Sequence, residues 1–124
     1  MSNYIDGFTL PIPKKYLDEY RIVSKQVAEI WKEYGAISYH EYVGDDLHHE
    51  GIRHFADATN AKSDEVVVFG WVEFESREAR DKANAQVPKD ARMNQLVGPL
   101  TNPSKLIFDA SRMVYGGFLP LVKE

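Results

Sequence analysis

Four ionisable residues lie in segments that are otherwise apolar, where they could take part in acid–base chemistry. They are Asp6, His40, Glu73 and Arg112. Burying a charge is costly unless it is paired, and titratable groups with shifted pKa values gather at functional sites. We expect Asp6 or Glu73 to act as a catalytic base, and Arg112 to orient an anionic group of a substrate. The alternative is a structural ion pair between Arg112 and one of these carboxylates, or contact of these residues with water at strand ends.

Aromatic residues in the same segments could shape a ligand pocket. Tyr39, Tyr42, Trp71 and Tyr115 combine apolar rings with hydroxyl or indole donors, as ligand pockets commonly do. We expect Trp71, Tyr115 and His40 to be ligand-binding residues. The alternative is that the aromatic rings only pack in the core or in an interface, where such side chains dominate burial.

A histidine-rich stretch is the third candidate. His48, His49, Glu50 and His54 follow Asp45 and Asp46, and imidazole and carboxylate groups suit zinc or iron. Adjacent histidines in an extended segment point in opposite directions, however, and no His-x-x-x-His pair is present. We therefore expect a solvated acidic loop, no metal ligands and no bound cofactor.

Composition limits the classes of protein that remain. The 124 residues suit a single domain, 1–124, and 44% hydrophobic residues are enough for a core. No cysteine is present, which excludes disulfides, thiolate zinc sites and cysteine nucleophiles. A net charge of −4 without a cluster of Lys and Arg argues against nucleic acid as a partner. The N-terminus lacks a secretory pattern and no apolar run could span a membrane, so we expect a cytoplasmic protein with no membrane partner.

The segment that must organise these residues is 65–74, a near-unbroken apolar run rich in β-branched and aromatic residues. Such a run is typical of a central strand that is covered on both faces. Alternation places Val66, Val68, Gly70, Val72 and Phe74 on one face, with Val67, Phe69, Trp71 and Glu73 on the other. Both faces of this strand must therefore be hidden from water.

Other segments supply the remaining elements. Apolar positions recur every three or four residues over 14–34, which predicts an amphipathic helix ended by Gly35 in a left-handed cap. A second helix over 77–87 begins after Ser76, which can cap it, and a short helix is expected over 90–97. Predicted strands cover 4–10, 37–43 and 112–119, and the first ends at a turn that begins at Pro11. The two glycines of the last strand suggest a bend, a bulge or close approach of another backbone. Residues 53–58 are expected to be extended and to pair locally.

This order of elements is that of an α+β ferredoxin-like fold, βαββαβ, with an antiparallel sheet and the helices on one face. The other face would carry Phe69 and Trp71, together with Phe8 and Leu10 if Asp6 points away from the helices. An apolar face of this size seldom stays in water. We therefore expect a homodimer in which two sheets meet face to face as a dimeric α/β barrel.

Several of these segments also carry a family resemblance: 4–8, 65–74 continuing into 76–84, 90–93 and 112–118. Together they make the chain similar to the YbaA-like family of uncharacterised bacterial proteins. One departure is Ala91, which stands where the family has proline and puts the local turn in question.

The resemblance implies the dimeric α/β barrel superfamily, whose members include cofactor-independent monooxygenases, haem-degrading enzymes, isomerases and stress-associated binding proteins. It brings no assigned catalytic residues, and fold alone does not choose among these activities. Two functions are therefore expected. One is a homodimer with a small-molecule cavity, either between the sheet and the helices or between the two sheets, catalysing a cofactor-independent reaction of monooxygenase or isomerase type. The other is a non-catalytic binding or stress-related accessory protein with a packed barrel. A cavity reached by at least two of the four ionisable residues would favour the first.

Overall fold

Four strands form one antiparallel sheet, and the computed structural model describes residues 3–124 of the chain. The strands are β1 (Tyr4–Pro13), β2 (Ser38–Val43), β3 (Glu65–Phe74) and β4 (Val114–Phe118), which lie in the order β2-β3-β1-β4. All three pairings are antiparallel. This order confirms the ferredoxin-like sheet predicted from the sequence.

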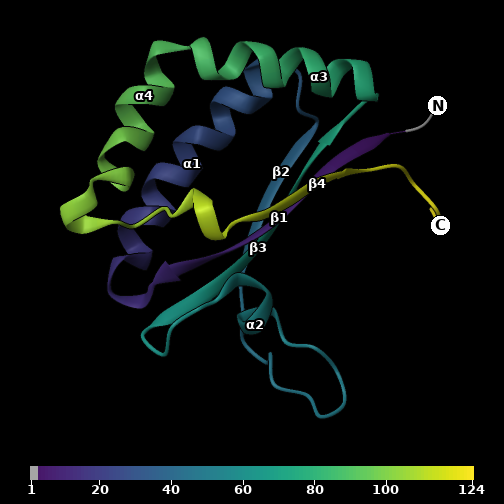
Figure 1. Ribbon diagram of the computed structural model, residues 1–124. Helices are drawn as coiled ribbons and strands as arrows, with labels where there is room; N and C mark the ends of the chain where they lie inside the picture. The colour runs from purple at the N-terminus through teal and green to yellow at the C-terminus, as the bar shows by residue number, and fades with distance from the viewer. Residues whose placement is uncertain (1–2) are drawn as a thin grey trace.

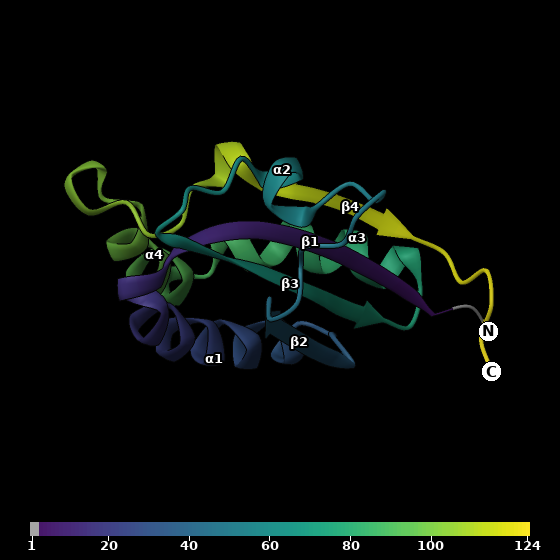
Figure 2. The ribbon, with the colours of Figure 1, turned by 90° about the horizontal axis from the view of Figure 1, so that it is seen from below.

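Three helices cover one face of the sheet, and a short one lies on the other. Figure 1 shows α1 (Leu17–Glu33), α3 (Arg77–Gln86) and α4 (Ala91–Val97) on the same side, with α2 (Phe55–Thr59) opposite. Seen from below, α1 and α2 lie on opposite sides of β1 and β3 (Figure 2). No helix within residues 3–124 is both long enough and apolar enough to cross a membrane.

Helix α1 forms where the sequence predicts it, and its apolar side faces the sheet. Tyr20, Val27 and Ile30 are buried, and the helix follows a short 3-10 turn over Lys14–Tyr16. Gly35 follows the helix with φ of +112°, the left-handed conformation that glycine adopts without steric cost. The predicted glycine cap is therefore confirmed.

Strand β3 has the predicted bounds and the predicted two faces. On one face, Val68, Val72 and Phe74 are buried in the core beneath the helices. On the other face, Phe69 remains 45% exposed. The sheet thus has an inner face toward α1, α3 and α4, and an outer face toward α2.

Phe8 and Leu10 of β1 were predicted on the outer face on the condition that Asp6 points away from the helices, and the structure does not meet this condition. Phe8 pairs with Gly70 and Leu10 with Val68, so both lie on the inner face rather than on the outer one. Asp6 also points inward, because Arg80 of α3 provides the cation that compensates its burial. The partner lies 74 residues away in the sequence, and no local pattern reveals it.

Strand β1 does not turn at Pro11 but continues to Pro13. Strand β4 pairs with β1 only as far as Thr9, so beyond that point β1 has no neighbour on that side. The missing N–H groups of Pro11 and Pro13 face this open side and remove no ladder hydrogen bond, as edge prolines do. The backbone N–H of Lys14, on the opposite side, bonds to Asp64 O at 2.9 Å.

Residues 53–58 are predicted to be extended, but the segment instead enters helix α2. Asn60 ends this helix at φ of +54°, a conformation that asparagine tolerates. Helix α2 packs against β1 and β3, where Thr9, Pro11 and Val67 of the outer face are buried. It therefore roofs one end of the outer face and leaves the other end open.

The last strand is shorter than predicted. Residues Ala110–Arg112 form a 3-10 turn, so Arg112 precedes β4 instead of belonging to it. The predicted close approach of another backbone is not found at Gly117, where an added Cβ would lie 2.1 Å from the hydroxyl oxygen of Tyr4. The neighbour is a side chain rather than another backbone.

Candidate functional site

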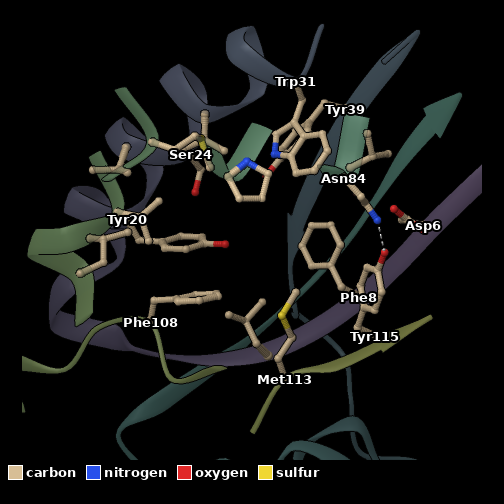
Figure 3. A pocket seen from close by; sticks show the side chains of 18 residues that line it. Asp6, Phe8, Tyr20, Ser24, Trp31, Tyr39, Asn84, Phe108, Met113 and Tyr115 are labelled. Carbon is tan, nitrogen blue, oxygen red and sulfur yellow. Dashed lines mark hydrogen bonds between the residues drawn. The ribbon is translucent and has the colours of Figure 1, made fainter. Parts of the chain in front are cut away.

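A cavity of about 510 Å³ lies between the inner face of the sheet and the helices. Figure 3 shows its aromatic walls, to which β1 contributes Phe8, α1 contributes Trp31 and the segment before β4 contributes Phe108. Most of the lining is apolar, and apart from the indole nitrogen of Trp31 the polar groups gather at two places. This combination is typical of a small-molecule site.

The first polar group is centred on Asp6. Arg80 Nη1 donates to Asp6 Oδ1 at 2.8 Å, and the two side chains are 11% and 5% exposed. The other guanidinium nitrogen, Nη2, donates to the hydroxyl of Tyr4 at 3.1 Å, and the guanidinium lies 4.7 Å from the centre of that ring. Arg80 is thus held against β1 by both charge and stacking.

Two further side chains complete this end of the cavity. Arg80 Nη1 and Asn84 Nδ2 each donate to the hydroxyl oxygen of Tyr115 at 3.2 Å, and Figure 3 shows the contact of Asn84 with Tyr115 beside Asp6. Burial raises the pKa of Asp6, although Tyr115, Arg80 and Asn84 oppose the shift. Burial also raises the pKa of the Tyr115 phenol. The result is a carboxylate more basic than usual beside a protonated hydroxyl.

The second polar group lies on β2, beneath α1. The Tyr39 hydroxyl donates to Glu41 Oε2 at 2.8 Å, and the Tyr20 hydroxyl donates to Glu41 Oε1. Burial raises the pKa of Glu41 against the effect of these hydroxyl donors and that of Ser24. Tyr20, Tyr39 and Ser24 line the cavity, whereas Glu41 lines the adjoining groove between α1 and β2 together with these three residues.

Two of the predicted site residues, Asp6 and Tyr115, line this cavity. Glu73 lies on the outer face, where Glu73, Trp71 and Tyr115 line an open hollow of about 660 Å³. There Glu73 accepts from Asn3 Nδ2 at 2.6 Å and from the Ser38 hydroxyl at 3.3 Å. It therefore has no access to the cavity as a base.

Arg112 is also remote from the cavity. Its guanidinium forms two bonds to Glu65, at 2.7 and 2.8 Å, and one to Asp109 at 2.8 Å. It also donates to the backbone oxygen of Asn60 at 2.9 Å. These contacts tie the turn before β4 to the start of β3, so the expected ion pair with Asp6 or Glu73 does not form.

His40 and Trp71 face outward and stack on each other. Their ring centres are 5.0 Å apart, and Tyr42 stacks on the same Trp71 at 5.6 Å. Asp6 is consequently the only one of the four predicted ionisable residues that lines the cavity. The cavity exists, but the charged set expected around it does not.

The histidine-rich loop is held by local contacts. His49 Nε2 lies 3.2 Å from Asp46 Oδ2, and His54 Nε2 lies 2.9 Å from the backbone oxygen of His49. In the part of the chain that the structure describes, no three histidine or carboxylate side chains are placed to hold a metal ion.

Four important residues were not singled out from the sequence: Arg80, Asn84, Tyr20 and Glu41. Arg80 and Asn84 looked like ordinary polar positions of a surface helix, and Glu41 like the solvated position of an alternating strand. One signal was available for the first two. They are four residues apart, hence on one side of the helix, and both fall in the run 76–84 that carries the family resemblance.

Comparison with known proteins places this geometry in a family. A family model described as a protein of unknown function (DUF1428) matches residues 3–109. The uncharacterised protein YbaA of Escherichia coli K12 is 35% identical over 121 residues, which cover 98% of each chain, and YbaA of Shigella flexneri matches equally well. The chain belongs to this YbaA-like family.

A solved structure supports the fold. A NIPSNAP family protein of unknown function from Agrobacterium tumefaciens superposes with a TM-score of 0.56 at 14% identity, covering 95% of this chain and 87% of that one. The YbaA-like chain also accommodates its Ala91 without distortion. Asp90 caps α4 by accepting from the Arg92 N–H at 2.9 Å, and Ala91 is the first helical residue, a position where proline is also favourable.

Proposed function

We propose that this YbaA-like protein binds a largely apolar small molecule in the cavity between sheet and helices, and that Asp6 is the general base of a cofactor-independent proton transfer there. One observation carries the proposal. A buried carboxylate with a raised pKa lies at the wall of an apolar cavity of about 510 Å³, beside hydrogen-bond donors. Apolar pockets with a few converging polar groups and a perturbed titratable residue are favoured as functional sites.

The geometry suits removal of an acidic proton from a bound ligand. Asp6 would accept a C–H or O–H proton, for which its raised pKa makes it a better base at neutral pH. The negative charge left on the ligand would lie near the Arg80 guanidinium and the Asn84 amide. In an isomerisation the same carboxyl group returns the proton to another atom of the ligand, so nothing else is consumed. A monooxygenase reaction would need molecular oxygen as well.

A second function, binding without catalysis, is favoured by a different observation. Asp6 is already engaged by Arg80, and no buried side-chain nitrogen or oxygen within residues 3–124 lacks a hydrogen-bond partner. A site whose polar groups satisfy one another can hold an apolar ligand without reacting with it.

The outer face of the sheet supports a homodimer. Tyr42, Phe69 and Phe118 are 60%, 45% and 56% exposed on this face, and an open hollow of about 660 Å³ runs past Val114 and Trp71. Helix α2 roofs only the end near Pro11. A second copy bringing the same flat apolar surface would complete a dimeric α/β barrel, as the family resemblance implies.

Calorimetric titration with 2-naphthol tests the cavity as a binding site. This probe is an apolar ring system with one hydroxyl that can donate to Asp6. Val23 lines the cavity from α1, so Val23→Phe should fill it and abolish binding, whereas Ile22→Phe, next to it but 63% exposed, should bind as the wild type does. Asp6→Asn should weaken binding about tenfold, the value of one hydrogen bond to a charged group. No binding by the wild type, or equal binding by Val23→Phe, contradicts the proposal.

A further inference from the structure

We infer that the ligand of this cavity carries hydrogen-bond donors at two opposite ends, one for Asp6 and one for the phenol oxygen of Tyr20, which Glu41 orients. This inference rests on the proposed function and specifies its ligand. The class is a flat, neutral, largely apolar molecule with two separated hydroxyl or N–H groups.

The first step is the unusual setting of Glu41. Two carboxylates that are almost fully buried have arginine partners: Asp6 has Arg80 at 2.8 Å, and Glu65 has Arg112 at 2.7 Å. Glu41 has no lysine or arginine within 4 Å among the described residues, and its partners are hydroxyl groups. Glu41 is half-buried, and even partial withdrawal of a carboxylate from water has a cost when no cation is paired with it, which argues that its charge does more than hold the fold together.

The second step concerns the direction of the Tyr20 hydroxyl. Its single hydrogen is donated to Glu41, and burial raises the pKa of this phenol, so it stays protonated. A hydroxyl that has given away its hydrogen offers only lone pairs to a further partner. Figure 3 shows the Tyr20 oxygen pointing into the cavity. The cavity therefore meets an acceptor at this point.

The third step is the separation of the two ends. Figure 3 places Tyr20 on one side of the cavity and Asp6, with Asn84 and Tyr115, on the other. The rings of Phe8 and Phe108 line the space, with no polar group of their own. A ligand that satisfies both ends must span an apolar gap between them.

The charge of Glu41 also determines which ligand groups are disfavoured at the Tyr20 end of the cavity. A carboxylate or carbonyl group at the Tyr20 end would face the lone pairs of the phenol with a negative charge behind it. Arg21 and Lys25 line the adjoining groove of about 370 Å³ between α1 and β2, which Tyr20 and Glu41 also line. They do not relieve this repulsion, because neither forms an ion pair with Glu41 and neither is part of the cavity wall. Anionic groups are therefore excluded from this end.

Three naphthalene probes test the inference by titration of the wild-type protein. We expect 2,6-dihydroxynaphthalene, which has donors at both ends, to bind about tenfold more tightly than 2-naphthol, which has one. We expect 6-hydroxy-2-naphthoate, with a carboxylate at the far end, to bind at least tenfold more weakly than 2-naphthol. In Tyr20→Phe the dihydroxy probe should lose its advantage, while 2-naphthol keeps its affinity. Glu41→Gln should restore part of the affinity for the carboxylate probe.

The outcomes distinguish failure of the two-ended ligand from failure of the cavity as a binding site. Equal affinity of the wild type for 2-naphthol and 2,6-dihydroxynaphthalene overturns the two-ended ligand and leaves the cavity site standing. A preference that survives in Tyr20→Phe overturns the role of Tyr20. Binding of none of the three probes removes the proposed function and this inference together. Because the first comparison uses only the wild type, it stands even if Tyr20→Phe does not fold.

Discussion

Arg80 Nη1 lies 2.8 Å from Asp6 Oδ1, and this contact joins helix α3 to the central strand β1 at the wall of the cavity. Both side chains are nearly excluded from water. The same guanidinium contacts the hydroxyls of Tyr4 and Tyr115. One arginine thus organises the strand, the helix and the edge strand around the candidate base.

Removing this cation should expose the cost of burying Asp6. Arg80→Met leaves a buried carboxylate without its partner, and we expect the free energy of unfolding at pH 7 to fall by about 3 kcal/mol. Adding Asp6→Asn should recover most of the loss, because a neutral amide needs no cation. Urea unfolding of both variants measures this. Arg77→Met, on the same helix but with a side chain 70% exposed, is the control and should change little. A double variant no more stable than Arg80→Met would contradict the ion-pair role.

The two glycines of β4 should differ in their tolerance of alanine. At Gly117 a Cβ would lie 2.1 Å from the Tyr4 hydroxyl, which Arg80 contacts, whereas at Gly116 the nearest atom is 3.7 Å away. Gly117→Ala should therefore lower the free energy of unfolding by about 1–3 kcal/mol through overpacking, with a much smaller effect for Gly116→Ala. Thermal unfolding of the pair tests this, and equal losses would show that Tyr4 moves aside freely.

The raised pKa of Glu41 makes the free energy of unfolding depend on pH. Above pH 4.5 the unfolded chain has lost this proton while the folded chain retains it, so wild-type stability falls as pH rises toward the folded pKa. Glu41→Gln cannot titrate. Its free energy of unfolding relative to the wild type should therefore increase with pH above 4.5 and level off once Glu41 is ionised in both states.

The pKa of Asp90 is shifted in the opposite direction from that of Glu41, so its effect on the pH dependence of stability has the opposite sign. Hydrogen bonds from Arg92 hold the pKa of Asp90 below its ordinary value of 3.8, so its contribution to stability is present above that pH and is lost as pH falls through the folded pKa. Urea midpoints of Glu41→Gln and Asp90→Asn, followed over pH, separate the two effects. A pH-independent difference for Glu41→Gln would mean that this carboxylate is not perturbed.

Trp71→Glu tests the proposed interface between sheets. The substitution places a charge on the outer face next to His40 and Tyr42, where a second copy would have to bury it without a partner. We expect sedimentation to give the mass of two chains for the wild type and of one chain for Trp71→Glu. Ile22→Glu, on the exposed side of α1, should leave the mass unchanged. A wild type that sediments as a single chain would remove the dimer.

The sequence predicts the fold well where one residue decides the local structure. The apolar run of β3, Gly35 after α1 and Ser76 before α3 all act as expected, and the Ser76 hydroxyl accepts from the Ala79 N–H at 3.1 Å. Prediction from the sequence fails where a partner that is distant in the sequence determines the orientation or burial of a side chain. The inward direction of Asp6 depends on Arg80, and the burial of Glu41 depends on Tyr20 of α1, so neither residue could be assigned to the cavity from its own strand.

Crystals soaked with 6-bromo-2-naphthol give the most direct test of a ligand site between the sheet and the helices, because anomalous scattering locates the bromine atom. We expect one ordered bromine inside the cavity lined by Val23, Phe108 and Tyr20, with the naphthol oxygen beside Asp6. A bromine found only on the outer face near Phe69, or no ordered bromine from a soak that saturates the protein in solution, would contradict the cavity as the functional site.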